Sequence, residues 1–310
     1  MRNFDHLIIQ AEEKTINWYP GHMARAKRKL MDQLSRVDVV VELCDARIPR
    51  ASRNPDLDEL VKNKKRLLIL NKADLAEQNK TNAWLAYYRQ QGMDVMSFDS
   101  AKGRAKDVLA RIERSASEAV ARMAAKGVKK TVRVMIVGVP NVGKSTFTNK
   151  INGASIAKTG DRPGVTRSNQ WVRITPYLEL LDTPGLLWPK LTDQNDAQCL
   201  AFVGTINDQV MDQQMLAIRL LERLMLDQKD ALVARFKIKD ASLTGVALLE
   251  EACRGRGWLM PGSVCDTDRG SAVILDEFRA GKVGRITLQK PPARKMAQPK
   301  EEKPAGDVQK

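Results

Sequence analysis

Patterned cysteine and histidine are what this chain of 310 residues most plainly lacks. Its four cysteines form no C-x-x-C pair (Cys44, Cys199, Cys253 and Cys265), and it has only two histidines. The number and spacing of these residues exclude a disulfide framework and a Cys/His zinc cluster. Unpaired cysteines suit a reducing compartment. The sequence also shows no signal peptide and no apolar run long enough to cross a bilayer. We therefore expect a cytoplasmic protein without a membrane span.

Aromatic residues are scarce as well, at 5% of the chain. Single-stranded nucleic acids are commonly bound by aromatic side chains interleaved with basic ones, and the sequence has no such pattern. Positive charge is in excess, because 52 Lys and Arg outnumber 37 Asp and Glu and give a net charge of +15. Basic residues gather at 25–29, 62–66 and 126–133. This charge indicates a protein that binds a polyanionic partner, above all the phosphate backbone of structured RNA. The alternative is a soluble basic protein without such a partner.

A phosphate-binding motif occupies residues 138–145, which read Gly-Val-Pro-Asn-Val-Gly-Lys-Ser and match G-x-x-x-x-G-K-[ST]. The apolar segment 132–137 before it predicts a buried strand, and a helix is expected from Thr146 onward. In such a loop backbone N–H groups surround phosphate oxygens, Lys144 reaches the β- and γ-phosphates, and the Ser145 hydroxyl binds Mg²⁺. The expected nucleotide contacts here are Asn141, Val142, Gly143, Lys144, Ser145 and Thr146. Alone, the motif does not distinguish ATP from GTP.

A guanine-reading motif, N-K-x-D, directly follows the apolar segment 66–70. The Asp74 carboxylate can accept hydrogen bonds from the ring N–H and the exocyclic amine of guanine, whereas adenine offers no matching pair of donors. The expected contacts from this motif are Asn71, Lys72 and Asp74. It therefore indicates GTP and GDP as the nucleotides.

A second base-binding element follows an expected strand at 94–98. It is the turn formed by Ser100, Ala101 and Lys102. In GTPases an S-A-K turn offers a backbone N–H to the guanine carbonyl, so these three residues are expected to contact the base.

A third segment, Asp182-Thr183-Pro184-Gly185, closes an apolar strand expected at 178–181. Asp182 is expected to hold the Mg²⁺ shell, and the Gly185 N–H is expected to contact the γ-phosphate, so the segment can sense hydrolysis. The turn-rich stretch 158–167 offers Thr166 as a second hydroxyl for Mg²⁺. Thr159 is the alternative, but Thr166 lies nearer the next expected strand.

Six expected strands define the fold class, at residues 37–43, 66–70, 94–98, 132–137, 170–174 and 178–181. Helical patterns lie between several of them, which predicts an α/β fold, a P-loop GTPase domain with a six-stranded sheet and flanking helices. The phosphate loop follows the fourth strand here, whereas it ordinarily follows the first. A compact domain keeps its core when its chain is reconnected elsewhere, so this order indicates a circularly permuted domain.

A change of pattern after Pro189 divides the chain. We expect the permuted GTPase domain at 1–200, a small mainly α-helical RNA- and ribosome-binding domain at 205–290, and a disordered basic tail at 291–310. Helices are expected at 208–226, 242–253 and 270–279. We expect a monomer.

Two further segments, Trp18-Tyr19-Pro20-Gly21-His22-Met23 and Asp45-Ala46-Arg47-Ile48-Pro49, complete the set of motifs. With the permuted order, they resemble the RbgA/YlqF family of circularly permuted GTPases, ribosome biogenesis GTPase A. The resemblance implies a GTPase that binds the large ribosomal subunit precursor and its rRNA and couples hydrolysis to a late assembly step. A nucleotide-gated RNA-binding protein with incidental hydrolysis is the first alternative. An RNA-modifying enzyme switched by GTP is the second, although no additional nucleophile or cofactor motif supports it.

Leu186 stands where Ras-like GTPases carry the Gln that orients the attacking water, and leucine cannot hydrogen-bond to water. By the resemblance, catalysis falls to His22 in the Pro-Gly-His-Met turn. On the residues alone, a structural or RNA-contacting His22 is an equal alternative. Asn141 suggests a bound K⁺, because related GTPases use an Asn here to hold the ion near the phosphates. The alternative is an Asn selected only for loop geometry.

Overall fold

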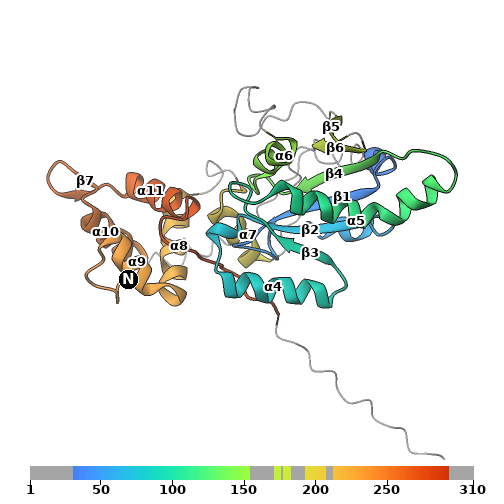
Figure 1. The fold of residues 1–310 in the computed structure, drawn as a ribbon. Helices are drawn as coiled ribbons and strands as arrows, with labels where there is room; N and C mark the ends of the chain where they lie inside the picture. Colours follow the sequence, from blue (N-terminus) through green and yellow to red (C-terminus); the bar gives the residue numbers. More distant parts are fainter. Residues whose placement is uncertain (1–30, 154–170, 176, 183–192, 207–211, 293–310) are drawn as a thin grey trace, which may run out of the picture.

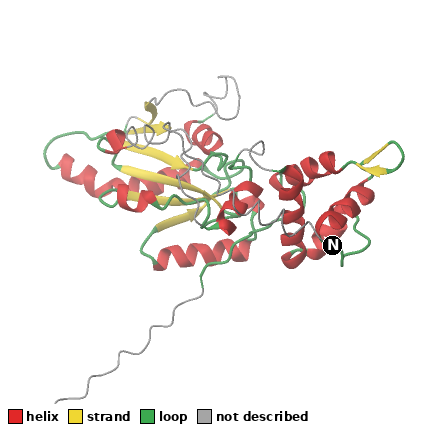
Figure 2. Ribbon diagram, turned by 180° about the vertical axis from the view of Figure 1, so that it is seen from behind, coloured by secondary structure: helices red, strands yellow, loops and turns green. Residues whose placement is uncertain are grey.

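The structure is a computed structural model, and it describes residues 31–153, 171–175, 177–182, 193–206 and 212–292. Figure 1 shows two parts: a sheet flanked by helices, and a group of helices beside it. We call them the sheet part and the helical part. Figure 2 shows from behind that helices lie on both sides of the strands.

A six-stranded sheet forms the core of the sheet part, in the order β3-β2-β1-β4-β6-β5. Its strands are β1 (Val39–Asp45), β2 (Lys65–Asn71), β3 (Asp94–Ser97), β4 (Val132–Gly138), β5 (Trp171–Thr175) and β6 (Leu178–Asp182). Neighbouring strands pair in parallel except β5, which is antiparallel to β6. The six expected strands are confirmed, and their ends differ from the expected ends by at most two residues. The strand of the phosphate loop, β4, is fourth in the chain yet lies inside the sheet, as the permuted order predicts.

Helices cover both faces of the sheet because its central strands are apolar on both sides. Val41 of β1 shares a core with Ile112 of α5 (Ala105–Ala124). On the opposite face Val40 packs with Leu57 of α3 (Asp56–Leu60), and Cys44 belongs to the cluster under α4 (Gln78–Gln90). Burial of both faces is typical of parallel strands.

The carboxyl ends of four parallel strands meet at one edge of the sheet. Asp45 at the end of β1 is in register with Asn71 at the end of β2. On the other side of β1, β4 ends at Gly138, and β6 ends at Asp182 beside it. The three expected nucleotide motifs therefore begin at the same edge, where open α/β sheets bind ligands.

The helical part contains α8 (Gln213–Asp227), α9 (Lys229–Phe236), α10 (Gly245–Arg256), α11 (Thr267–Arg279) and the hairpin β7 (Leu259–Met260) and β8 (Val264–Cys265). The helix α7 (Gln194–Phe202) lies between it and the sheet (Figure 1). The three helices expected after residue 205 correspond to α8, α10 and α11. The described start of α8 is capped by Asp212, whose carboxylate accepts from the N–H groups of Gln214 and Met215. Among the helices of the described ranges, none is both long and apolar enough to cross a membrane.

After α11 the chain returns to the sheet part. We call residues 285–289 the C-terminal strap. The strap is bonded to two loops of the sheet part, because the Ile286 N–H donates to the Leu75 carbonyl (2.9 Å) and the Leu288 N–H donates to the Arg47 carbonyl (2.8 Å). Ile286 and Leu288 are buried, at 3% and 4% exposed. The expected division at residues 200–205 stays a prediction, and most of the expected tail, 293–310, lies outside the described residues.

Candidate functional site

The phosphate loop connects β4 to α6 (Lys144–Asn152) and is packed closely against β1. A Cβ on Gly138 would lie 2.6 Å from the Leu43 carbonyl oxygen, so a larger residue does not fit there. Gly143 has φ +93°, a conformation that favours glycine, and directly precedes α6. Lys144 Nζ donates to the carbonyls of Gly138 (3.2 Å) and Val139 (2.8 Å). A glycine-rich turn with its lysine at a helix start is the arrangement that cradles phosphate.

Asn71 joins the base-reading and phosphate-binding segments. Its Nδ2 donates to the Val142 carbonyl in the phosphate loop (2.9 Å), and its Oδ1 accepts from Ser100 Oγ (2.7 Å). Asn71 is fully buried, and a Cβ on Gly143 would lie only 2.7 Å from its Nδ2. One amide therefore fixes three motifs that the sequence places far apart.

Lys72 reaches from the base reader toward the phosphate loop. Its backbone is left-handed, with φ 56°, and its Nζ donates to the Asn141 carbonyl (2.6 Å). The same amine lies 3.3 Å from Asp45 Oδ2. Burial lowers the pKa of Lys72, and the negative charge of Asp45 opposes that effect. Lys72 thus links the ends of β1 and β2 to the loop after β4.

Asp45 and Arg47 form a buried ion pair next to Lys72. Arg47 Nε and Nη2 donate to the two carboxylate oxygens of Asp45 at 2.9 and 2.8 Å, and both side chains are 2% exposed. Burial alone would raise the pKa of Asp45, but the charges of Arg47 and Lys72 outweigh it and hold the pKa well below its usual value. Asp45 therefore stays ionised and anchors the Lys72 amine. In the sequence these residues indicate only the family resemblance, and no local pattern marks their supporting role.

Asp99 closes the S-A-K turn. Its Oδ1 accepts from the backbone N–H groups of Ala101 (2.8 Å) and Lys102 (3.1 Å), and Lys150 of α6 donates to the Ala101 carbonyl (3.1 Å). The N–H groups expected to meet the guanine carbonyl are thus bonded to Asp99 in this structure. A base contact at this turn requires one of them to be shared with guanine or exchanged.

Asp74 is exposed in η1 (Ala73–Leu75), a short 3-10 turn after Lys72. Its side chain is accessible, as a residue that reads a base must be. The carbonyl of Asp74 accepts from Arg285 Nε of the strap (3.0 Å). This contact joins residues that are 211 positions apart, so no local sequence pattern marks it.

The residues expected to bind Mg²⁺ are placed in part. Ser145 is exposed in the first turn of α6, and the backbone of Asp182 ends β6 in register with Ile136 of β4. In the part of the chain that the structure describes, no group of three or more His, Cys, Asp or Glu could form a metal site. Ser and Asp are residue types that fit Mg²⁺, which takes few protein ligands and completes its shell with phosphate oxygens and water.

His22, Thr166 and Gly185 lie outside the described residues, as do Thr159 and Leu186. Their roles stay predictions. Of the remaining expected contacts, Val142 is buried and Thr146 is exposed beside Ser145.

Two contacts that no local sequence pattern marks join the phosphate loop to the segment after α7. Asn141 Nδ2 donates to the Gly204 carbonyl, and Thr205 Oγ1 donates to the Pro140 carbonyl (3.2 Å). Arg279 of α11 in turn donates to carbonyls at the end of α7. The phosphate loop is therefore in direct contact with the segment that leads into the helical part.

Comparison with known proteins agrees with this geometry. A protein-family model described as "50S ribosome-binding GTPase" matches residues 133–242. A relative named "Ribosome biogenesis GTPase A", from Priestia megaterium, is 42% identical over 280 residues, which are 89% of this chain and 97% of the relative. The structure of GDP-bound YlqF is 27% identical with a TM-score of 0.63, and the match covers 85% of this chain and 99% of that one. GNP-bound YlqF from Thermotoga maritima is also 27% identical, with a TM-score of 0.61 and coverage of 86% and 98%.

These matches extend over the sheet part and the helical part alike. The sheet order, with the phosphate-loop strand fourth in the chain, agrees with a permuted GTPase. The protein accordingly hydrolyses GTP and binds GTP and GDP with Mg²⁺. The chain belongs to the ribosome biogenesis GTPase A (RbgA/YlqF) family of circularly permuted P-loop GTPases.

Proposed function

We propose that this GTPase binds the maturing large ribosomal subunit and couples GTP hydrolysis to a late step of its assembly in the cytoplasm. One observation carries the proposal. The similarity to the relative named "Ribosome biogenesis GTPase A" covers 97% of that relative and so includes the helical part as well as the GTPase core. The family model whose description names the 50S ribosome spans residues 133–242, from β4 to beyond α9.

The charge distribution supports an RNA partner, and part of the positive charge is paired within the protein. Of the expected basic clusters, Arg66 is paired with Glu42 and Asp58. Lys62 and Lys129 are exposed near the amino ends of β2 and β4, which is the sheet edge opposite the nucleotide motifs. RNA bound there would leave the nucleotide edge accessible. With a net charge of +15, association should weaken as salt rises.

We further propose the nucleotide contacts that the motifs predict. Asn71, Lys72, Asp74 and the turn Ser100–Lys102 hold guanine, and residues 141–146 hold the phosphates. Ser145, Asp182 and Thr166 complete the Mg²⁺ shell, and the Gly185 N–H contacts the γ-phosphate. The hydrogen bond from Asn71 to Val142 supports this assignment, because it sets the base reader and the phosphate loop at a fixed separation.

Asn141 is proposed as a K⁺ ligand. Its backbone is left-handed, with φ 59°, and its Nδ2 is bonded to Gly204, so its Oδ1 is the atom that would coordinate the ion. A cation there would offset negative charge that develops on the phosphates in the transition state. His22 is proposed as the catalytic residue that positions the attacking water, a role that Leu186 cannot fill.

The proposal is tested by cosedimentation with large-subunit precursor particles in the presence of a non-hydrolysable GTP analogue or GDP. We expect tighter binding with the analogue, weakening as salt rises, and no comparable binding to mature small subunits. Equal affinity in the two nucleotide states would contradict a nucleotide-controlled step. Specific, nucleotide-dependent binding without any particle effect on turnover would favour the alternative, a nucleotide-gated RNA-binding protein with incidental hydrolysis.

A further inference from the structure

The C-terminal strap is bonded to each residue of the turn that presents the guanine reader. Arg285 Nε donates to the Asp74 carbonyl (3.0 Å), and Arg285 Nη2 donates to the Ala73 carbonyl (3.4 Å). The Ile286 N–H donates to the Leu75 carbonyl (2.9 Å). Three consecutive carbonyls of η1 are therefore held by two consecutive strap residues.

The next strap residue fixes the segment that follows η1. Thr287 Oγ1 accepts from the Glu77 N–H (3.0 Å), and the Thr287 N–H donates to Glu77 Oε1 (3.3 Å). Lys80 of α4 donates to the Thr287 carbonyl (3.1 Å). Thr287 is 1% exposed. The strap thus binds the chain on both sides of Ala76, from η1 to the first turns of α4.

These hydrogen bonds matter because η1 is short and must hold Asp74 in a fixed orientation. It follows Lys72, whose left-handed backbone is uncommon for a residue with a side chain. Asp74 itself is exposed. Its carboxylate must meet two donors on one edge of guanine, so small rotations of η1 change both hydrogen bonds at once.

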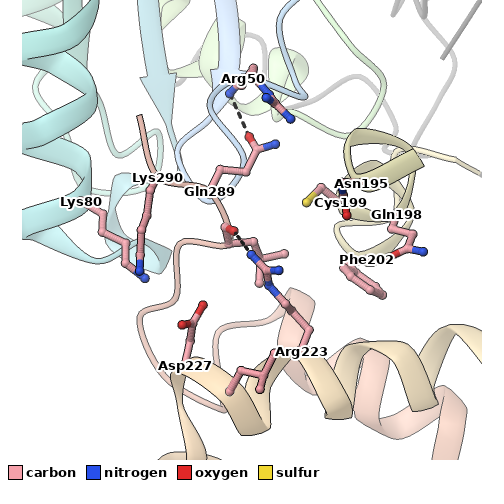
Figure 3. Close-up of a pocket in the computed structure, with 12 residues that line it drawn as sticks. Arg50, Lys80, Asn195, Gln198, Cys199, Phe202, Arg223, Asp227, Gln289 and Lys290 are labelled. Carbon is pink, nitrogen blue, oxygen red and sulfur yellow. Dashed lines mark hydrogen bonds between the residues drawn. The ribbon is translucent and has the colours of Figure 1, made fainter. Parts of the chain in front are cut away.

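The strap is also tied to the helical part. Arg223 of α8 donates to the Leu288 carbonyl (2.9 Å), the contact drawn in Figure 3. Figure 3 also shows Gln289 reaching Arg50, and its Oε1 accepts from the N–H groups of Arg50 (3.0 Å) and Ala51 (3.1 Å). A displacement of α8 relative to the sheet would therefore pull on the strap between two fixed points.

We propose that the strap, through Arg285, positions Asp74 for guanine recognition. Through the strap, guanine affinity also depends on the position of the helical part relative to the sheet part. Arg285 is a positioning residue in this account, since it holds the backbone of the base reader and acts on the base through Asp74. A partner that moves the helical part would then change nucleotide release as well as particle binding.

The test compares GDP with IDP, which lacks the exocyclic amine that Asp74 is expected to bind. Arg285→Ala removes two side-chain hydrogen bonds to η1, and we expect GDP affinity to fall about tenfold. IDP affinity should fall less, so the preference for GDP over IDP should shrink. The kcat at saturating GTP should stay unchanged, because the phosphate loop is not touched. Arg285→Lys should lie in between, since an ammonium has the charge but not the planar fork that reaches both carbonyls.

Two further variants separate positioning from general effects. Lys282→Ala removes a positive charge from an exposed residue just before the strap and should leave the GDP-to-IDP ratio unchanged. Arg223→Met breaks the bond between α8 and the strap without touching η1, and it should lower the ratio in the same direction as Arg285→Ala. An Arg285→Ala protein with the wild-type ratio and wild-type GDP release, or an equal loss for GDP and IDP, would overturn the positioning role. A wild-type ratio in Arg223→Met would overturn the dependence on the helical part.

Discussion

The buried pair of Asp45 and Arg47 allows a prediction whose size can be worked from the structure. Arg47 makes two charge-assisted hydrogen bonds to Asp45, donates a third to the Arg279 carbonyl (3.2 Å), and places its guanidinium 5.6 Å from the ring centre of Phe278. Arg47→Ala would remove all of these contacts and leave a carboxylate that is 2% exposed without its main partner. Breaking a buried pair in this way costs about 3–5 kcal/mol of folding free energy.

Arg50→Ala is the matched control, because Arg50 lies in the same loop and also forms ion pairs, with Asp193 and Asp196. The Arg50 side chain is 51% exposed, so its pairs are screened by water and its loss should cost less than about 1 kcal/mol. Urea unfolding followed by circular dichroism measures both variants, provided that the m-value stays constant. A loss for Arg47→Ala no larger than that for Arg50→Ala would refute the reasoning.

The same ion pair makes the free energy of unfolding depend on pH in a known direction. The pKa of Asp45 is lower in the folded protein than in the unfolded chain, so the pair contributes its full stability above the ordinary carboxyl pKa. That contribution is lost as pH falls toward the folded-state value. The stability difference between wild type and Arg47→Ala should therefore narrow below about pH 4. A difference that widens on acidification would contradict the assigned direction of the pKa.

Three further predictions concern the nucleotide. Asp74→Asn should lose GTP affinity and gain affinity for xanthosine triphosphate, measured by equilibrium titration, because the amide offers the donor that xanthine requires; unchanged GTP affinity would contradict the base assignment. Replacing K⁺ by Na⁺ should slow GTP hydrolysis in the wild type but not in Asn141→Ala, and a wild-type rate indifferent to the cation would exclude the proposed ion. His22→Ala should bind GTP and precursor particles normally yet lose most particle-stimulated turnover, and wild-type stimulated turnover would place the catalytic group elsewhere.

The sequence predicted the parts of this site that are written in short segments. The phosphate loop and the N-K-x-D motif each combine a buried strand with a polar turn, and both features are local. An alternation of apolar and polar residues was not needed to find these strands, because parallel strands covered on both faces are mostly apolar along their length, as in 39–45 and 132–138. The order of the motifs along the chain was then sufficient to indicate the permutation.

Contacts between segments that lie far apart in the chain could not be predicted from the sequence. Asp45 and Arg47 lie two positions apart in the chain, but their role follows from burial beside Lys72, which only the sheet register creates. The bonds from Asn141 to Gly204 and from Arg285 to Asp74 join residues 63 and 211 positions apart. The short helices α7 and α9, of nine and eight residues, were missed because so few turns give little periodic signal.

The rate of GTP hydrolysis with and without purified large-subunit precursors tests the central claim most directly. Single-turnover hydrolysis should be followed in K⁺ and Mg²⁺, with mature small subunits as the control for non-specific RNA. We predict a saturable acceleration by the precursors that the small subunits do not produce. An identical rate in all three conditions would contradict the coupling of hydrolysis to assembly of the large subunit.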